Sequence, residues 1–268
     1  MTPEPLRLDG EFGTVAGFRL GNGSGRPLVM LHASGTGPAT LLALAQTAAE
    51  AGRTVWVPGF DGYGGTAIAG GGESIARHCT VLEAVLAALG GEVELFGHSM
   101  GGLIALTVAA RGALPVRGIT AVEPVAIGVL REHAEDAAAL APDAEAVAKI
   151  APAMAEGRHE DAVRDFISLW NGRAWDKMPE KMRTAIIRMA PQIHADTSSV
   201  SFATTPAAHY SSIPCPVRLV ATERGPVTAH AVIRRLLSAN TAWREERIAG
   251  VGHMGPIEAP AAFAHLVS

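Results

Sequence analysis

Short apolar runs alternate with longer segments of helical periodicity through most of the chain. The runs predict strands at residues 12–20, 27–32, 53–58, 92–96, 116–123, 216–221 and 243–248. Apolar residues three or four positions apart predict helices at residues 38–51, 73–89, 100–111, 227–238 and 256–267. This alternation predicts an α/β fold with a mostly parallel central sheet flanked by helices.

The alternation is interrupted between residues 124 and 212, where no strong strand signal occurs. The helices predicted there cover residues 133–141, 144–156, 160–170 and 179–189. We therefore expect a core of residues 1–124 and 213–268, with an inserted helical cap of residues 125–212. The insert contains Phe166, Trp170 and Trp175, which we expect in the interior of the cap, with contact to a ligand as the alternative.

Composition excludes several classes of function. With 268 residues and 48% hydrophobic residues, the chain can bury the core of one large domain. A net charge of -4 and scattered arginines give no basis for binding nucleic acid. The apolar run 101–110 is too short to span a membrane, and residues 1–5 do not resemble the start of a signal peptide. We expect a soluble, cytoplasmic protein in which Cys79 and Cys215 are free thiols.

The sharpest motif is the segment GHSMGG at residues 97–102, which matches the pattern G-x-S-x-G. It follows a predicted strand and opens a predicted helix. In such a tight turn the flanking glycines avoid collisions, and the serine hydroxyl is exposed at the amino end of the helix. The pattern predicts that Ser99 is a nucleophile.

A serine hydroxyl needs a general base to become nucleophilic. The candidate is His253, in the segment GVGHMGP at residues 250–256, between the last predicted strand and the last predicted helix. The chain order of serine first and histidine near the end, at the last strand, favours this residue. The other histidines show no spacing typical of zinc ligands, so no metal is expected.

With these motifs the chain resembles the serine-nucleophile branch of the α/β-hydrolase superfamily over nearly its whole length. The matching segments are LHASG at 31–35, DGYGGT at 61–66, GHSMGG at 97–102 and GHMGP at 252–256. The resemblance implies that the backbone N–H groups of Ser34 and Met100 form the oxyanion hole. The Ser34 hydroxyl is either a third donor or the cap of a turn, and His32 is expected to brace the loop.

The acid partner of the histidine is the least regular part of the resemblance. Many members of the superfamily carry an Asp after the seventh strand, but that position here is Gly225, in the segment ATERGP at 221–226. Haloalkane-dehalogenase-like members place the acid after the sixth strand, where this chain has Glu123. We therefore expect Glu123 to complete the triad, with Glu223 as the alternative.

The resemblance implies a serine hydrolase that cleaves a small, partly apolar carboxylic ester or related acyl substrate through an acyl-enzyme, without cofactor or metal. Lactone, amide and carbon–carbon bond hydrolysis remain open, as does acyl transfer. The alternative is a ligand-binding or signalling protein on the same scaffold with little turnover. The segment GYGGTA at 62–67 is followed by a loop, GGG at 70–72, so a dinucleotide site is not expected.

Overall fold

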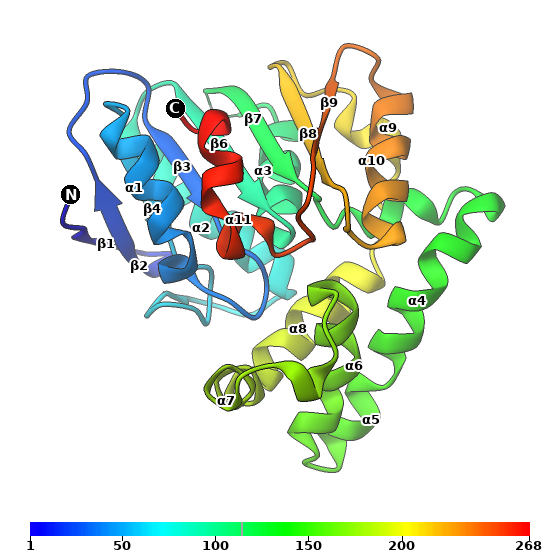
Figure 1. Cartoon of the computed structure of the whole chain (residues 1–268). Helices are drawn as coiled ribbons and strands as arrows, with labels where there is room; N and C mark the ends of the chain where they lie inside the picture. Colours follow the sequence, from blue (N-terminus) through cyan, green and yellow to red (C-terminus); the bar gives the residue numbers. More distant parts are fainter. Residues whose placement is uncertain (114) are drawn as a thin grey trace.

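The computed structural model describes residues 1–113 and 115–268 and contains a nine-stranded sheet (Figure 1). The strand order is β1-β2-β4-β3-β6-β7-β8-β9, and β5 pairs with β2. The strands are β1 (Glu4–Gly10), β2 (Gly13–Leu20), β3 (Leu28–Leu31), β4 (Val55–Pro58), β5 (Ala67–Ile68), β6 (Val93–His98), β7 (Val116–Val122), β8 (Val217–Thr222) and β9 (Arg244–Ile248). Along this order, neighbouring strands from β4 through β3 and β6 to β9 are parallel. Strand β2 pairs antiparallel with β1, β4 and β5. The predicted mostly parallel sheet is confirmed.

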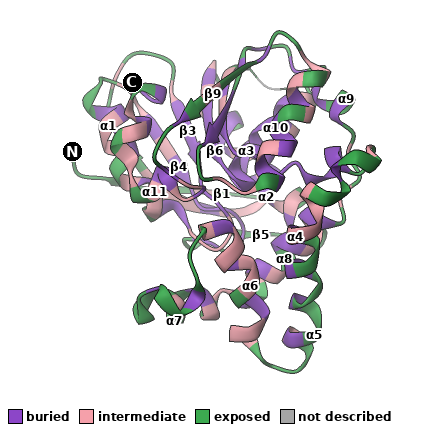
Figure 2. Cartoon of the chain, turned by 45° about the vertical axis from the view of Figure 1, so that its right-hand side comes forward, coloured by how far each residue is buried: buried purple, intermediate pink, exposed green. Residues whose placement is uncertain are grey.

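Helices cover both faces of the sheet, because neighbouring side chains of a strand point to opposite faces. On β6, Leu95 packs with the cluster under α2 (Ser74–Leu89), α3 (Met100–Ala110) and α10 (Val227–Ala239). Its neighbour Phe96 packs with the cluster under α1 (Leu42–Glu50) and the C-terminal helices. The two apolar layers hold the central strands rigidly, and inner strands such as β3 and β6 are coloured as largely buried in Figure 2.

Between β7 and β8 the chain forms helices and no strand, within the described residues. These are α4 (Ala137–Ala148), α5 (Ile150–Ala155), α6 (His159–Asn171), α7 (Glu180–Arg188), α8 (Ala190–Ser201) and the short α9 (Ala207–Tyr210). We call α4 to α8 the cap. Figure 1 shows the cap as a group of helices to one side of the sheet. None of the helices in the described part of the chain is long and apolar enough to cross a membrane.

Several elements differ from the sequence-based expectation. Strands β1 and β5 and helices α8 and α9 were not predicted. The continuous helix predicted over 256–267 is wrong: it is divided into α11 (Gly255–Glu258) and a 3₁₀ helix over Pro260–Leu266. Pro260 is the reason for the break, since the residue before a proline is disfavoured in helical conformation. Ala259 accordingly has φ −140°.

Candidate active site

Ser99 occupies the sharp turn between β6 and α3. Its φ of 56° and ψ of −115° lie in a region that residues with a side chain rarely adopt. The Ser99 N–H donates to the Val122 carbonyl at 2.9 Å, and the Ser99 carbonyl accepts from the Gly102 N–H at 3.0 Å. These bonds tie the turn to both β7 and α3, so the surrounding structure holds the strained conformation.

Two glycines make this turn possible. A Cβ atom at Gly97 would lie 2.4 Å from the Gly101 carbonyl oxygen, and one at Gly101 would lie 2.3 Å from the Leu31 carbonyl oxygen. Both distances are too short for any side chain, so these positions require glycine. The resulting close packing of α3 on the sheet places Ser99 at the amino end of this helix, where the helix dipole favours negative charge.

His253 lies in the loop after β9 and faces Glu123, the residue that follows β7. The distance from His253 Nδ1 to Glu123 Oε2 is 2.7 Å, and both side chains are buried. The Nδ1–H group donates to the carboxylate, which leaves Nε2 with a free lone pair. The alternative acid, Glu223, is exposed and accepts from the Gly250 N–H at 2.6 Å. The structure therefore brings Glu123, and not Glu223, to His253.

Gly225 gives a physical reason for this arrangement. A Cβ atom at residue 225 would lie 2.0 Å from Glu123 Oε1, inside the space that the carboxylate fills. The same oxygen accepts from the Thr222 N–H at 2.7 Å and from the Thr222 hydroxyl at 2.6 Å. A side chain at residue 225 and the Glu123 carboxylate therefore cannot occupy this space together. In this protein residue 225 is glycine, and the Glu123 carboxylate fills the space.

The surroundings of Glu123 keep its carboxylate ionised. Burial alone would raise its pKa, but the imidazoles of His230 and His253 outweigh burial and hold the pKa of Glu123 below its usual range. His230 Nε2 lies 3.6 Å from Glu123 Oε1 but 2.8 Å from the Thr222 carbonyl oxygen. Among the described residues, the non-glycine residues with positive φ are Ser99 and Glu123.

Ser34 and Met100, the predicted oxyanion donors, line the same cavity as Ser99. Met100 is the first residue of α3, so its N–H has no acceptor within the helix. The Ser34 N–H donates no hydrogen bond to another described residue. The Ser34 hydroxyl donates to Asp196 Oδ2 at 2.7 Å. It is therefore neither the cap of a turn nor free to act as a third oxyanion donor.

His32 braces the loop that carries Ser34. Its Nδ1–H donates to the Ala33 carbonyl at 2.8 Å, and its Nε2 accepts from the Phe60 N–H at 3.1 Å. One donor and one acceptor fit a neutral imidazole, and burial lowers the pKa of His32 to about 4. The loop before the cavity is thus anchored to the turn after β4.

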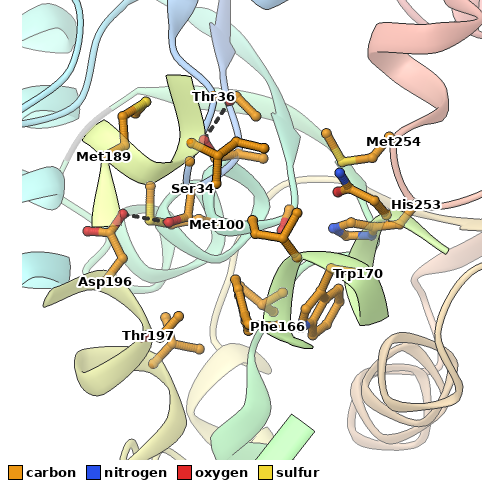
Figure 3. A pocket seen from close by; sticks show the side chains of 18 of the residues that line it. Ser34, Thr36, Met100, Phe166, Trp170, Met189, Asp196, Thr197, His253 and Met254 are labelled. Atoms are coloured by element: carbon orange, nitrogen blue, oxygen red, sulfur yellow. Dashed lines mark hydrogen bonds between the residues drawn. The ribbon is translucent and has the colours of Figure 1, made fainter. Parts of the chain in front are cut away.

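A cavity of about 260 Å³ lies over Ser99 and is walled mainly by the cap. Apolar side chains dominate its lining, among them Phe166, Ile167, Trp170, Ile186, Met189 and Val200. Figure 3 shows His253 and Trp170 on one side of the pocket and Asp196 and Met189 on the other. The ring centroids of Trp170 and His253 are 4.7 Å apart. Trp170 and Phe166 therefore face the cavity, whereas Trp175 lies in the cap interior as expected.

Ser99 and His253 both border this cavity, but no hydrogen bond joins their side chains within the part of the chain that the structure describes. Catalytic hydrogen bonds between a nucleophile and its base often tighten only when substrate binds. The described residues include no cluster of three or more His, Cys, Asp or Glu side chains suited to a metal ion.

Two buried carboxylates in the cavity lining were missed at the level of sequence. Asp143 of α4 accepts from the Trp170 indole N–H at 2.9 Å, and burial raises its pKa. Asp196 of α8 accepts from the hydroxyl of Ser34. Neither aspartate belongs to a motif, and each meets partners that are distant in sequence. The only available signal was an acidic residue in a segment whose other side chains form an apolar wall.

Buried histidines predict that the free energy of unfolding decreases in mild acid. Burial lowers the pKa of His98 to about 3, as it lowers that of His32 to about 4, from an ordinary value of 6.5. Between pH 6.5 and 4 these two histidines therefore bind more protons in the unfolded chain than in the native protein. Stability therefore decreases as the pH falls through this window, by up to about 1.4 kcal/mol per pH unit for each histidine.

Urea denaturation at about pH 7, 6 and 5 measures this dependence. In His98→Asn the free energy of unfolding is expected to depend less steeply on pH, because the contribution of one buried histidine is removed. His209→Gln changes an exposed histidine and is the control, for which the slope stays at the wild-type value. An unchanged slope in His98→Asn contradicts the assignment.

Comparisons with known proteins agree with this architecture. The sequence model of the Alpha/beta hydrolase family matches residues 28–266. A comparison with curated proteins finds no match.

Several solved structures are similar over almost the whole chain. An alpha/beta hydrolase from Sphaerobacter thermophilus has 23% identity and a TM-score of 0.72, with 98% of each chain covered. The carboxylesterase CesB from Bacillus subtilis has 15% identity and a TM-score of 0.74, covering 100% of this chain and 90% of that one. A bromoperoxidase from Bacillus anthracis has 16% identity and a TM-score of 0.74, with 98% of each chain covered. At these identities the similarity concerns the fold.

Proposed function

This chain belongs to the alpha/beta hydrolase family, and from that premise we propose that it is a serine hydrolase. The proposed reaction is cleavage of a carboxylic ester or related acyl substrate through an acyl-enzyme. The observation that carries the proposal is the arrangement of Ser99 at the cavity, beside a His253 whose Nδ1 is 2.7 Å from the buried Glu123 carboxylate. A nucleophile, a base and a group that orients the base are the parts that acyl transfer requires.

In the proposed mechanism, Ser99 Oγ attacks the carbonyl carbon and its proton passes to His253 Nε2. Glu123 holds the Nδ1–H and stabilises the positive charge that forms on the imidazole. The backbone N–H groups of Ser34 and Met100 donate to the oxyanion. The leaving group then takes the proton from His253 and departs. Water repeats the sequence on the acyl-enzyme, with His253 again as base, and releases the acid and free Ser99.

The cavity supports a compact substrate with an uncharged, largely apolar acyl group. Its walls are apolar cap side chains. Its two buried acids, Asp143 and Asp196, would make it unfavourable to bury a carboxylate of the substrate there. The similar structures include a carboxylesterase, which agrees with an ester as the first substrate to try. The inserted residues 125–212 are proposed to act as the cap that shapes this specificity.

The decisive test is labelling with a fluorophosphonate probe, read out as the mass of the intact protein. We expect one adduct on the wild-type protein and none on Ser99→Ala, since only an activated serine attacks the phosphorus. Hydrolysis of p-nitrophenyl butyrate by the same samples provides the turnover measurement. An unlabelled, inactive wild type would contradict the proposal and favour a ligand-binding protein. A wild type that is labelled without turnover would also favour that alternative.

A further inference from the structure

Asp196 is a buried carboxylate that reaches from the cap into the core. It lies on α8, and its side chain is 1% exposed. Five side-chain donors surround it, one from the cap and four from the core. They are the amide of Gln192 at 2.9 Å, the hydroxyls of Ser34 at 2.7 Å, of Tyr63 at 2.6 Å and of Ser74, and Nε2 of His78 at 3.0 Å.

These contacts leave the carboxylate no capacity for a ligand. Two carboxylate oxygens offer about four acceptor sites, and five donors already compete for them. Burial would raise the pKa of Asp196, but the contacts with His78 and Ser74 outweigh burial and lower it. The carboxylate is therefore ionised and fully used in holding its neighbours, which excludes recognition of a cationic substrate group.

The cluster is also not a second catalytic triad, although it contains a serine, a histidine and an aspartate. In a triad the histidine uses one ring nitrogen for the serine and the other for the acid. Here Nε2 of His78 lies near both Ser74 Oγ, at 3.1 Å, and Asp196 Oδ1. Ser74 also donates directly to Asp196. The His78 ring therefore has no free lone pair directed at Ser74 to act as a base.

The contacts of Asp196 lead to the loop that carries the proposed oxyanion donor. Ser34 is held by its own hydroxyl, and the next residue is held through Tyr63, whose hydroxyl accepts from the Gly35 N–H at 2.9 Å. Gly35, the residue after Ser34, has φ 69°, a backbone conformation that favours glycine. Figure 3 shows the dashed bond between Asp196 and Ser34 at the edge of the pocket. One carboxylate thus fixes two successive residues of the loop.

We propose that Asp196 is a positioning residue that directs the Ser34 N–H toward the oxyanion. Through Asp196, this direction depends on the cap being packed against the core. The inference rests on the proposed function. Because α8 belongs to the cap, moving the cap away removes the acceptor shared by Ser34 and Tyr63. Small misplacements of an oxyanion donor are costly because the donor must meet a charge that develops only in the transition state.

The test is Asp196→Asn, an isosteric change that replaces one acceptor oxygen with an NH₂ donor. Removal of an oxyanion donor lowers kcat by about 10²–10³-fold, so we expect a misdirected donor to lower it by about 10–100-fold. KM for p-nitrophenyl butyrate is expected to stay within about threefold, because the apolar walls are intact. Affinity for an alkyl boronic acid, which forms a tetrahedral adduct with the serine, is expected to fall with kcat.

The matched control is Asp136→Asn. Asp136 is equally buried and accepts from Arg234 at 2.9 Å and from Arg235, but it does not line the cavity. Its loss is expected to lower the melting temperature and to leave kcat near the wild-type value. Should Asp196→Asn fail to fold, Tyr63→Phe carries the same test, since it removes the acceptor of the Gly35 N–H and is expected to lower kcat without raising KM.

The two proposals fail in different ways. The positioning role alone is overturned if the wild type is active and labels at Ser99 while Asp196→Asn or Tyr63→Phe keeps the wild-type kcat. A variant in which KM rises and kcat is unchanged has the same meaning. A wild type that neither labels nor turns over overturns the proposed function and this inference with it. A drop in kcat that boronic acid affinity does not follow overturns the link to the oxyanion.

Discussion

Replacing Glu123 with glutamine is expected to lower kcat about 10⁴-fold, the loss typical of a triad whose acid becomes an amide. The buried carboxylate accepts the Nδ1–H of His253 at 2.7 Å and so keeps the lone pair on Nε2. A glutamine NH₂ group facing Nδ1 would donate instead, which places the proton on Nε2 and removes the base. Burst and steady-state rates with p-nitrophenyl butyrate measure the effect.

The control for this variant is Glu223→Gln. Glu223 is exposed, and its carboxylate accepts from the Gly250 N–H, a role that the amide oxygen of glutamine can keep. We therefore expect kcat to stay within about twofold of the wild type, as for most surface substitutions. A large loss in Glu223→Gln with little loss in Glu123→Gln would reverse the assignment of the acid. Thermal melts of both variants separate a catalytic loss from unfolding.

The order of strands and helices around Ser99 could be predicted because each element carries a strong local signal. The strand of residues 92–96, the segment GHSMGG and the helix after it follow one another directly in the sequence. Strand β1 lacked such a signal. Its sequence EPLRLDG contains a proline and three charged residues, and most of its side chains are exposed at the edge of the sheet.

The contacts of α8 lay beyond prediction for a related reason. Its sequence APQIHADTSSVS combines a proline, a threonine and three serines, which have low helix propensity. Tertiary contacts hold this helix, since Ile193 and Val200 are buried and Asp196 pairs with groups as distant in sequence as Ser34, 162 residues away. Local patterns contain no information on such pairings. The sequence favoured Glu123 over Glu223 as the acid, but the contact of Glu123 with His253, 130 residues away, is visible only in the structure.

Gly225→Ala is expected to lower kcat about 10²–10³-fold, although alanine adds only one carbon atom and residue 225 takes no part in the proposed chemistry. The new Cβ would lie 2.0 Å from Glu123 Oε1, so the carboxylate has to move. Because the carboxylate orients His253, its displacement is expected to cost part of the 10⁴-fold effect of losing the acid. Gly225 has no positive φ, so the substitution adds no backbone strain.

Gly252→Ala is the matched control, since its Cβ would meet its nearest neighbour, the Arg224 carbonyl oxygen, at an ordinary 3.5 Å. Its kcat is expected to stay near that of the wild type. A Gly225→Ala variant with the same kcat as this control would show that the exact place of the carboxylate does not matter.

The double variant Glu123→Ala with Gly225→Asp tests whether the carboxylate can be supplied from residue 225 instead. Its aspartate enters the space that the glutamate leaves, so kcat is expected to exceed that of Glu123→Ala alone by at least about tenfold. Such a recovery follows only if one carboxylate site beside His253 can be supplied from either strand, β7 or β8.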